Sequence, residues 1–110
     1  MKVEQFLNRN QFHLYDDKLN VDILQSYNSK VVGITNNRGC YQCITLGRDW
    51  DYSTTTSKHL YAFLDIYLYD YLEDMNGDNI KNTLRHTNNR RKYIQKLIDN
   101  KIFLYDEEMN

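Results

Sequence analysis

Residues 30–46 read KVVGITNNRGCYQCITL, and this stretch decides how the first half of the chain folds. Residues 30–35 are mostly β-branched and apolar, and residues 40–46 continue with a composition that also suits an extended strand. Between them, Asn36, Asn37 and Gly39 tolerate the positive φ angles that tight turns use. The stretch therefore predicts a β-hairpin.

The segments before this hairpin predict further extended structure. Residues 12–15 and 21–24 carry alternating or continuous apolar side chains, with a polar turn at residues 16–18. Residues 2–8 are compatible with a short helix that asparagines interrupt. The N-terminal half is thus expected to form an antiparallel sheet of three or four short strands.

After Gly47 the apolar period changes from two residues to that of a helix. Hydroxyl side chains at residues 53–57 offer N-caps, and large apolar residues then recur at three- and four-residue spacing as far as Leu72. This pattern predicts a long helix from about Thr56 to Glu73 that covers one face of the sheet. Residues 79–86 and 90–100 predict two short amphipathic helices, and residues 102–105 a closing strand. The expected fold class is α+β.

The length of 110 residues suits a single domain with one modest core. Asp65 and Asp70 interrupt the longest apolar stretch, so it is too short for a membrane span, and the N-terminus lacks the apolar region of a signal peptide. A cytoplasmic protein is therefore expected. Within the domain, residues 78–101 form a basic helical segment and residues 106–110 an acidic tail.

The net charge of −1 hides an uneven distribution. Residues 79–101 contain seven Lys and Arg against one Asp, a net charge of +6, so the rest of the chain carries −7. A basic segment beside an acidic body can orient a charged partner. The asymmetry favours a binding function.

Catalytic and metal-binding patterns are weak. Cys40 and Cys43 form a CxxC pair, but a structural zinc needs four ligands, and on one strand this spacing directs the two side chains to opposite faces. Structural thiols are the favoured interpretation, with metal or redox use as the alternative. His59 near Ser53 and Asp51 is a possible general base, although capping explains the hydroxyl residues equally well. We therefore predict no enzyme, no cofactor and no metal.

The basic segment around residues 85–96 is the best candidate for contact with a nucleic acid or another anionic partner. Its cations can neutralise phosphates, its amides can donate hydrogen bonds, and its tyrosine can stack on an unpaired base. The alternative is a solvated helix face, although cations at a helix start oppose the helix dipole. The predicted binding residues are Arg85, Asn88, Asn89, Arg90, Arg91, Lys92, Tyr93 and Lys96.

A second candidate surface lies on the predicted long helix. Its tyrosines cover more of the helix than a one-sided core stripe requires, so some rings must reach the surface, where tyrosine is common in protein interfaces. Packing against the C-terminal helices would explain them equally well. The predicted partner interface comprises Lys58, His59, Tyr61 and Tyr69.

Residues 26–28 read SYN, residues 30–34 KVVGI, and residues 50–64 WDYSTTTSKHLYAFL. This succession resembles an uncharacterised domain family of small phage and prophage proteins, in which SYN precedes a WDYSxTTxKHLxxFL pattern. The resemblance covers residues 25–64 and implies a phage-related origin and a β-then-helix core, without an activity.

Within this motif the residue types favour a mainly architectural role. Trp50 and Tyr52 are expected to pack at the end of the hairpin, Asp51 or Ser53 to cap the helix, and Lys58 with its neighbour to lie in an exposed first turn. A contact with a ligand or partner is the alternative for the polar members of the motif.

The leading functional hypothesis is a phage or prophage accessory protein that binds and inhibits a host nucleoprotein complex, such as a CRISPR effector, without catalysis. It rests on the family resemblance, the small size, the weak catalytic patterns and the charge asymmetry. The alternative is a stand-alone RNA- or DNA-binding regulatory module. The two differ in whether a host protein is needed for binding.

Overall fold

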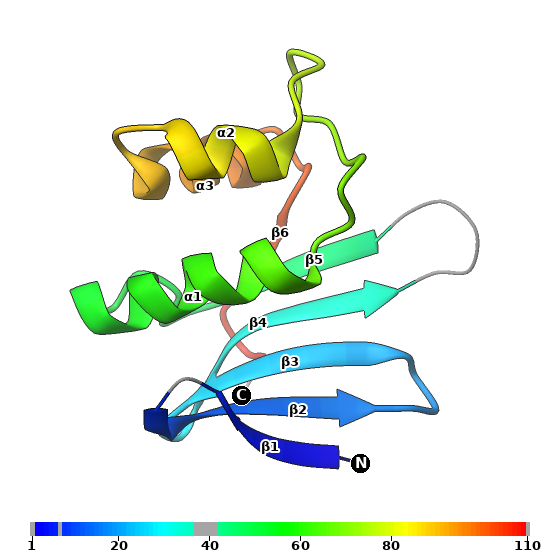
Figure 1. The fold of residues 1–110 in the computed structure, drawn as a ribbon, viewed down its shortest axis with the longest axis vertical. Helices are drawn as coiled ribbons and strands as arrows, with labels where there is room; N and C mark the ends of the chain where they lie inside the picture. Colours follow the sequence, from blue (N-terminus) through cyan, green and yellow to red (C-terminus); the bar gives the residue numbers. More distant parts are fainter. Residues whose placement is uncertain (1, 7, 37–41, 110) are drawn as a thin grey trace.

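The computed structural model describes residues 2–6, 8–36 and 42–109, which form one sheet and three helices (Figure 1). Within these ranges no helix has the length and apolarity that crossing a membrane requires. The elements in chain order are β1 (Lys2–Phe6), β2 (Asn8–Asp16), β3 (Val21–Ser26), β4 (Ser29–Asn36), β5 (Gln42–Gly47), α1 (Thr54–Tyr67), α2 (Ile80–His86), α3 (Arg90–Asp99) and β6 (Leu104–Asp106).

The sheet has six strands in the order β1-β2-β3-β4-β5-β6. The first five run antiparallel to their neighbours, as successive strands joined by short connections do. Strand β6 returns from the three helices and pairs with β5 in parallel, with Thr45 opposite Leu104. The sheet is therefore mixed, and the C-terminal strand forms one of its edges.

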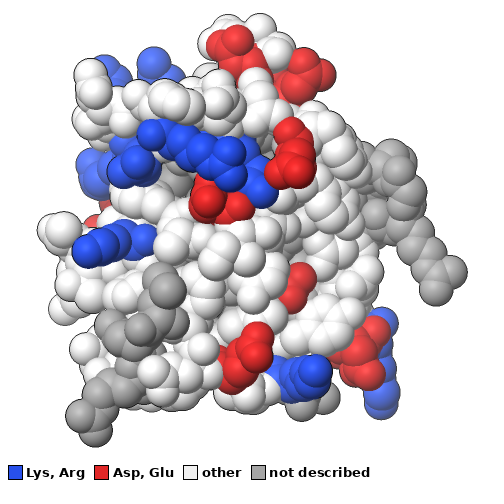
Figure 2. All heavy atoms as spheres, in the orientation of Figure 1, with Lys and Arg blue, Asp and Glu red and all other residues white. Residues whose placement is uncertain are grey.

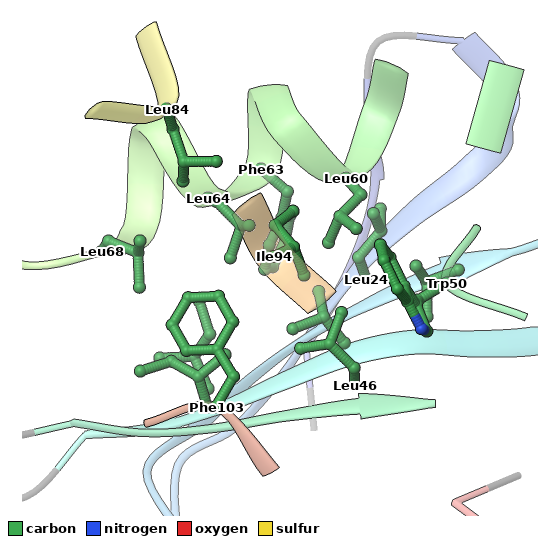
Figure 3. Close-up of a cluster of buried hydrophobic side chains, with 14 of the residues drawn as sticks. Leu24, Leu46, Trp50, Leu60, Phe63, Leu64, Leu68, Leu84, Ile94 and Phe103 are labelled. Atoms are coloured by element: carbon green, nitrogen blue, oxygen red, sulfur yellow. The ribbon is translucent and has the colours of Figure 1, made fainter. Parts of the chain in front are cut away.

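One face of the sheet supports the core. Val32 pairs with Leu46 and Ile34 with Ile44 across β4 and β5, so alternate residues of both strands point towards α1. In Figure 3 the side chains of the sheet, of α1 and of the C-terminal elements meet in one cluster. The described part of the chain has one continuous core from Phe6 to Phe103.

Helix α1 begins and ends for different reasons. The Ser53 hydroxyl accepts a hydrogen bond from the Thr56 backbone N–H at 3.1 Å, which is the usual N-cap. The buried face includes Leu60, Phe63 and Leu64. After Tyr67 the backbone becomes extended, with a ψ of 144° at Leu68, although Leu68 itself remains in the core.

Helices α2 and α3 lie beside α1, on the side of the molecule where β5 and β6 lie (Figure 1). Leu84 on α2 and Ile94 and Leu97 on α3 are buried in the same cluster as the α1 side chains. The basic helical segment is therefore part of the single core and is held rigidly against α1.

Two expectations about the strands need correction. The sheet has six strands instead of three or four, and residues 2–6 form edge strand β1 and not a helix. The expected closing strand is observed as β6, but it pairs with β5 in parallel, so the sheet is not wholly antiparallel. Pairing of Lys2 with Tyr15 and Glu4 with His13 outweighs the weak local helical tendency. The predicted turn at residues 37–41, and Cys40 with it, lie outside the described residues.

Three expectations about the long helix and its motif are also wrong. The helix ends at Tyr67 and not near Glu73. The other two concern the burial of Tyr52 and His59 in the motif. Trp50 is buried as expected, whereas Tyr52 is 80% exposed. His59, expected in an exposed turn, is buried on the face of α1 that also carries Leu60 and Phe63.

Candidate functional site

A groove of about 330 Å³ lies between α1 and the two C-terminal helices. Helix α1 contributes residues at three- and four-residue spacing, so they form one stripe beside the buried stripe of the same helix. Helix α2 contributes a second stripe with the same spacing, and α3 contributes its first residue. The lining residues of this cationic groove are Lys58, Tyr61, Ala62, Asp65, Lys81, Leu84, Arg85 and Arg90.

The lining contains four cations and one anion, a net charge of +3. In Figure 2, Lys and Arg atoms gather in a band over the helices, with Asp or Glu atoms beside it. Only part of this charge is neutralised locally. The groove therefore has the electrostatic character of an anion-binding surface.

Two of the four cations have carboxylate partners. Arg85 Nε donates to Asp65 Oδ1 at 2.6 Å, and this hydrogen bond, together with the charge of Asp65, raises the pKa of Arg85. Lys81 Nζ donates to Asp70 Oδ1 at 2.9 Å, and this hydrogen bond lowers the pKa of Asp70. Both pairs join α2 to the segment formed by α1 and the residues that follow it.

The other two cations, Lys58 and Arg90, have no carboxylate within 4 Å among the residues that the structure describes. Lys58 is exposed on α1. Arg90 is oriented by backbone acceptors, since its Nε donates to the Leu84 carbonyl at 2.7 Å and its Nη2 to the Arg85 carbonyl at 3.5 Å. Its guanidinium carbon also lies 5.6 Å from the centre of the Tyr61 ring.

These two side chains therefore leave positive charge at the groove that no carboxylate of the described ranges balances. Arg90 is the more fixed of the two, because the carbonyls at the end of α2 and the Tyr61 ring hold its guanidinium plane. The Nε and Nη2 groups of Arg90 donate to these carbonyls, so its Nη1 group is the part of this fixed guanidinium that can donate to a phosphate. Lys58 adds a flexible cation on the opposite wall.

The remaining cations of the basic segment do not line this groove. Arg91 lies within 2.8 Å of Asp51 and ties the start of α3 to the turn after β5. Lys92 and Lys96 are exposed on α3, outside the groove lining. The cations of the basic segment thus have three different environments. Some line the groove, Arg91 pairs with Asp51, and Lys92 and Lys96 are exposed to solvent.

Two of the predicted contact residues, Asn89 and Tyr93, have a structural role within the fold. Asn89 is the N-cap of α3 and accepts from the Lys92 backbone N–H at 3.0 Å, while Asn88 is exposed. Tyr93, expected to stack on a base, packs against the core and donates its hydroxyl to Asp74 Oδ2 at 2.6 Å. Burial and then this hydrogen bond raise the pKa of Tyr93.

The predicted partner surface on α1 is also divided. Lys58 and Tyr61 line the cationic groove, so the structure joins them to Arg85 and Arg90 of the basic segment. His59 is buried and does not form a surface, and Tyr69 lies beyond the end of α1. The two surfaces predicted separately from the sequence therefore meet at one groove.

Sequence reasoning counted Lys81 in the basic segment but did not assign it to a site, and it missed Asp65 and Ala62 as groove residues. The signal was present in the spacing of residues 58, 61, 62 and 65, which share one helix face. The spacing identifies a groove wall only once α2 is known to pack beside α1. Among the described residues, no three His, Cys, Asp or Glu side chains are placed to share a metal ion, and Cys43 is a half-buried free thiol.

The fold and the groove define a small α+β protein with a mixed sheet on one side and a helical, cationic surface on the other. The chain belongs to the family of unknown function DUF8033, whose model matches residues 1–82. The match includes Lys58, Tyr61 and Lys81, whereas Arg85 and Arg90 lie beyond it. No curated protein and no solved structure matches the chain.

Proposed function

We propose that this protein is a non-catalytic nucleic-acid-binding protein whose cationic groove receives backbone phosphates. The observation that carries the proposal is that Lys58 and Arg90 both line the groove and that neither has a carboxylate partner among the described residues. Because phosphate neutralisation supplies most of the affinity of such proteins, two available cations and a net lining charge of +3 favour this function.

The hypothesis that this nucleic acid belongs to a host nucleoprotein complex, such as a CRISPR effector that a phage or prophage protein inhibits, stays a prediction. It depends on the resemblance of residues 25–64 to phage proteins and on the charge asymmetry. Purification of the protein from a bacterial host would test it. Recovery of the protein without any nucleic-acid-processing complex would count against that partner while leaving nucleic-acid binding open.

The direct test of the groove is Lys58→Glu. Lys58 is exposed and has no carboxylate partner among the described residues, so its charge reversal should leave the stability nearly unchanged. Binding to a short oligonucleotide should weaken at every sequence tested. The slope of log affinity against log salt concentration should become shallower by about one unit, which corresponds to the loss of one phosphate contact.

Lys18→Glu is the matched control, because Lys18 is exposed in the turn between β2 and β3 and makes the same change in net charge outside the groove. Its salt slope should equal that of the unmodified protein. Arg90 is unsuitable for this test, since its substitution would also remove hydrogen bonds to the end of α2. Equal slopes for Lys58→Glu and Lys18→Glu would show that the groove does not contact phosphate.

A further inference from the structure

A second hollow, of about 660 Å³, adjoins the cationic groove. The two share Lys81, which lines both. The lining of the second hollow differs from that of the groove, because aromatic and amide side chains predominate in it. Its charged residues are one cation, Lys81, and two anions, Asp22 and Asp70. The second hollow thus has a net charge of −1, against +3 for the groove.

The apolar part of this hollow is a platform formed by Ile66, Tyr69 and Tyr71, here called the tyrosine platform. The rings of Tyr69 and Tyr71 lie with their centres 5.4 Å apart and their planes inclined by 31°. Ile66 and Tyr71 are each 57% exposed. Large apolar side chains at this exposure are outside the core and available to a ligand.

The platform is fixed from below. The Tyr69 backbone N–H donates to Gln42 Oε1 at 2.8 Å, and the Ile80 N–H donates to the Leu72 carbonyl at 2.9 Å, so the segment between α1 and α2 is anchored at both ends. A rigid aromatic surface loses little conformational entropy when a ligand stacks on it.

The hydroxyl groups of Tyr69 and Tyr71 differ in their hydrogen bonding from those of the other two tyrosines that line this hollow, Tyr15 and Tyr67. Tyr15 donates its hydroxyl to Asn20 at 3.0 Å, and the Tyr67 hydroxyl lies 3.1 Å from His13 Nδ1, so both are engaged within the protein. No hydrogen bond of the Tyr69 or Tyr71 hydroxyl is found within the described ranges. Tyr71 is exposed and Tyr69 is half-buried beside it, so the Tyr71 ring is the main surface that a ligand can reach.

We propose that the tyrosine platform stacks unpaired bases of a single-stranded nucleic acid whose phosphates lie in the cationic groove. This inference rests on the proposed function and names the form of nucleic acid that it concerns. The charges decide the orientation of the strand. Phosphates are attracted to the groove and disfavoured beside Asp22 and Asp70, whereas a neutral base can enter the second hollow and stack on Tyr69 or Tyr71.

A duplex is a poor ligand for this arrangement, because its bases are already stacked and their faces are covered. Stacking on aromatic rings is tolerant of sequence, since every base has a π face. Ribose and deoxyribose strands both satisfy this chemistry. RNA and DNA oligonucleotides of the same sequence are therefore separate arms of the test, and each is expected to bind.

The DNA arm of the test compares two probes on the full chain, a short oligo(dT) and an abasic sugar-phosphate strand of the same length, by fluorescence anisotropy, and the RNA arm repeats the comparison with ribose strands. The unmodified protein should bind oligo(dT) about tenfold more tightly than the abasic strand. Tyr71→Ala should weaken oligo(dT) binding by a similar factor and leave the abasic strand unchanged. Lys58→Glu should weaken both strands.

Tyr52→Ala is the matched control, because Tyr52 is exposed but lines neither hollow. It should bind both strands as the unmodified protein does. Equal affinity of the unmodified protein for both strands would overturn the inference without needing any variant. The proposed function would still stand if that common affinity depended on Lys58. Failure of both strands to bind at low salt would overturn the inference and the proposed function together.

Discussion

Gln42 is the residue on which the connection between sheet and helix depends. Its buried side chain donates from Nε2 to Asn36 Oδ1 at 2.7 Å and to the Tyr67 carbonyl at 2.9 Å, while its Oε1 accepts from the Tyr69 N–H. The last carbonyls of a helix need partners from outside the helix. By supplying one, Gln42 explains why α1 ends at Tyr67 although apolar residues continue to Leu72.

Gln42→Leu tests this role with a side chain of similar size. The change leaves the Tyr67 carbonyl and the Tyr69 N–H without the amide that pairs them, so the free energy of unfolding should fall by about 1–3 kcal/mol. Urea denaturation measures the difference. Gln95→Leu, on the exposed face of α3, should change it by less than about 0.5 kcal/mol. A similar effect at both positions would refute the role assigned to Gln42.

Contacts between residues close in the sequence could be predicted, whereas contacts between distant residues could not. The Ser53 cap was among the predicted ones, because a hydroxyl three positions before a helical N–H is a local signal. The Gln42 contact joins positions 25 apart, and the Tyr93 contact with Asp74 joins positions 19 apart. Neither has a local pattern, so the end of α1 was predicted wrongly and the contact of Tyr93 with Asp74 was not predicted.

Among the elements, the start of α3 shows how an unfavourable local placement is compensated. Arg90 and Arg91 lie at the N-terminus of a helix, where the helix dipole disfavours cations. Arg90 instead places its guanidinium on carbonyls at the C-terminus of α2, where a cation is favoured, and Arg91 pairs with Asp51. The cationic sequence of α3 therefore stabilises the contact between helices as well as forming part of the groove.

Glu73 and Asn79 form an isolated antiparallel bridge, and the turn between them contacts α3 through Asp74. This buried carboxylate accepts from the Tyr93 hydroxyl and from the backbone N–H groups of Asn76 and Asp78, at 2.6, 2.8 and 3.0 Å. Burial acts to raise the pKa of Asp74, but these hydrogen bonds together lower it below its ordinary value. Asp74 is thus ionised in the folded protein wherever the unfolded chain would hold it ionised.

The lowered pKa of Asp74 predicts a pH dependence. A carboxyl whose pKa is lower in the folded state stabilises the fold fully above its unfolded pKa of about 4, and this contribution disappears as the pH falls through the folded value. The difference in unfolding free energy between the unmodified protein and Asp74→Asn should therefore shrink below about pH 4. Tyr93→Phe should reproduce part of that change. A difference that stays constant from neutral to acid pH would contradict the prediction.

For the molecule as a whole, the sequence predicted the two layers better than the size of the sheet. The extended segments at residues 12–15, 21–24 and 30–35, and the helices at residues 79–86 and 90–100, lie within or close to the observed elements. The groove was predicted only as two unconnected sets, because helical spacing identifies a face but not the neighbour of that face. Packing of α1 against α2 brought Lys58 and Tyr61 beside Arg85.

The parallel pairing of β6 with β5 has a consequence for how the chain reaches its folded state. Thr45 and Leu104 are about 60 residues apart, whereas the first five strands are joined by short connections. Closing a flexible loop of this length costs about 2 kcal/mol more in chain entropy than closing a turn of a few residues. The β5–β6 contact is therefore too weak to form before the helices between these strands have packed. Strand β6 is expected to join last, and any event that loosens the helices should release it first.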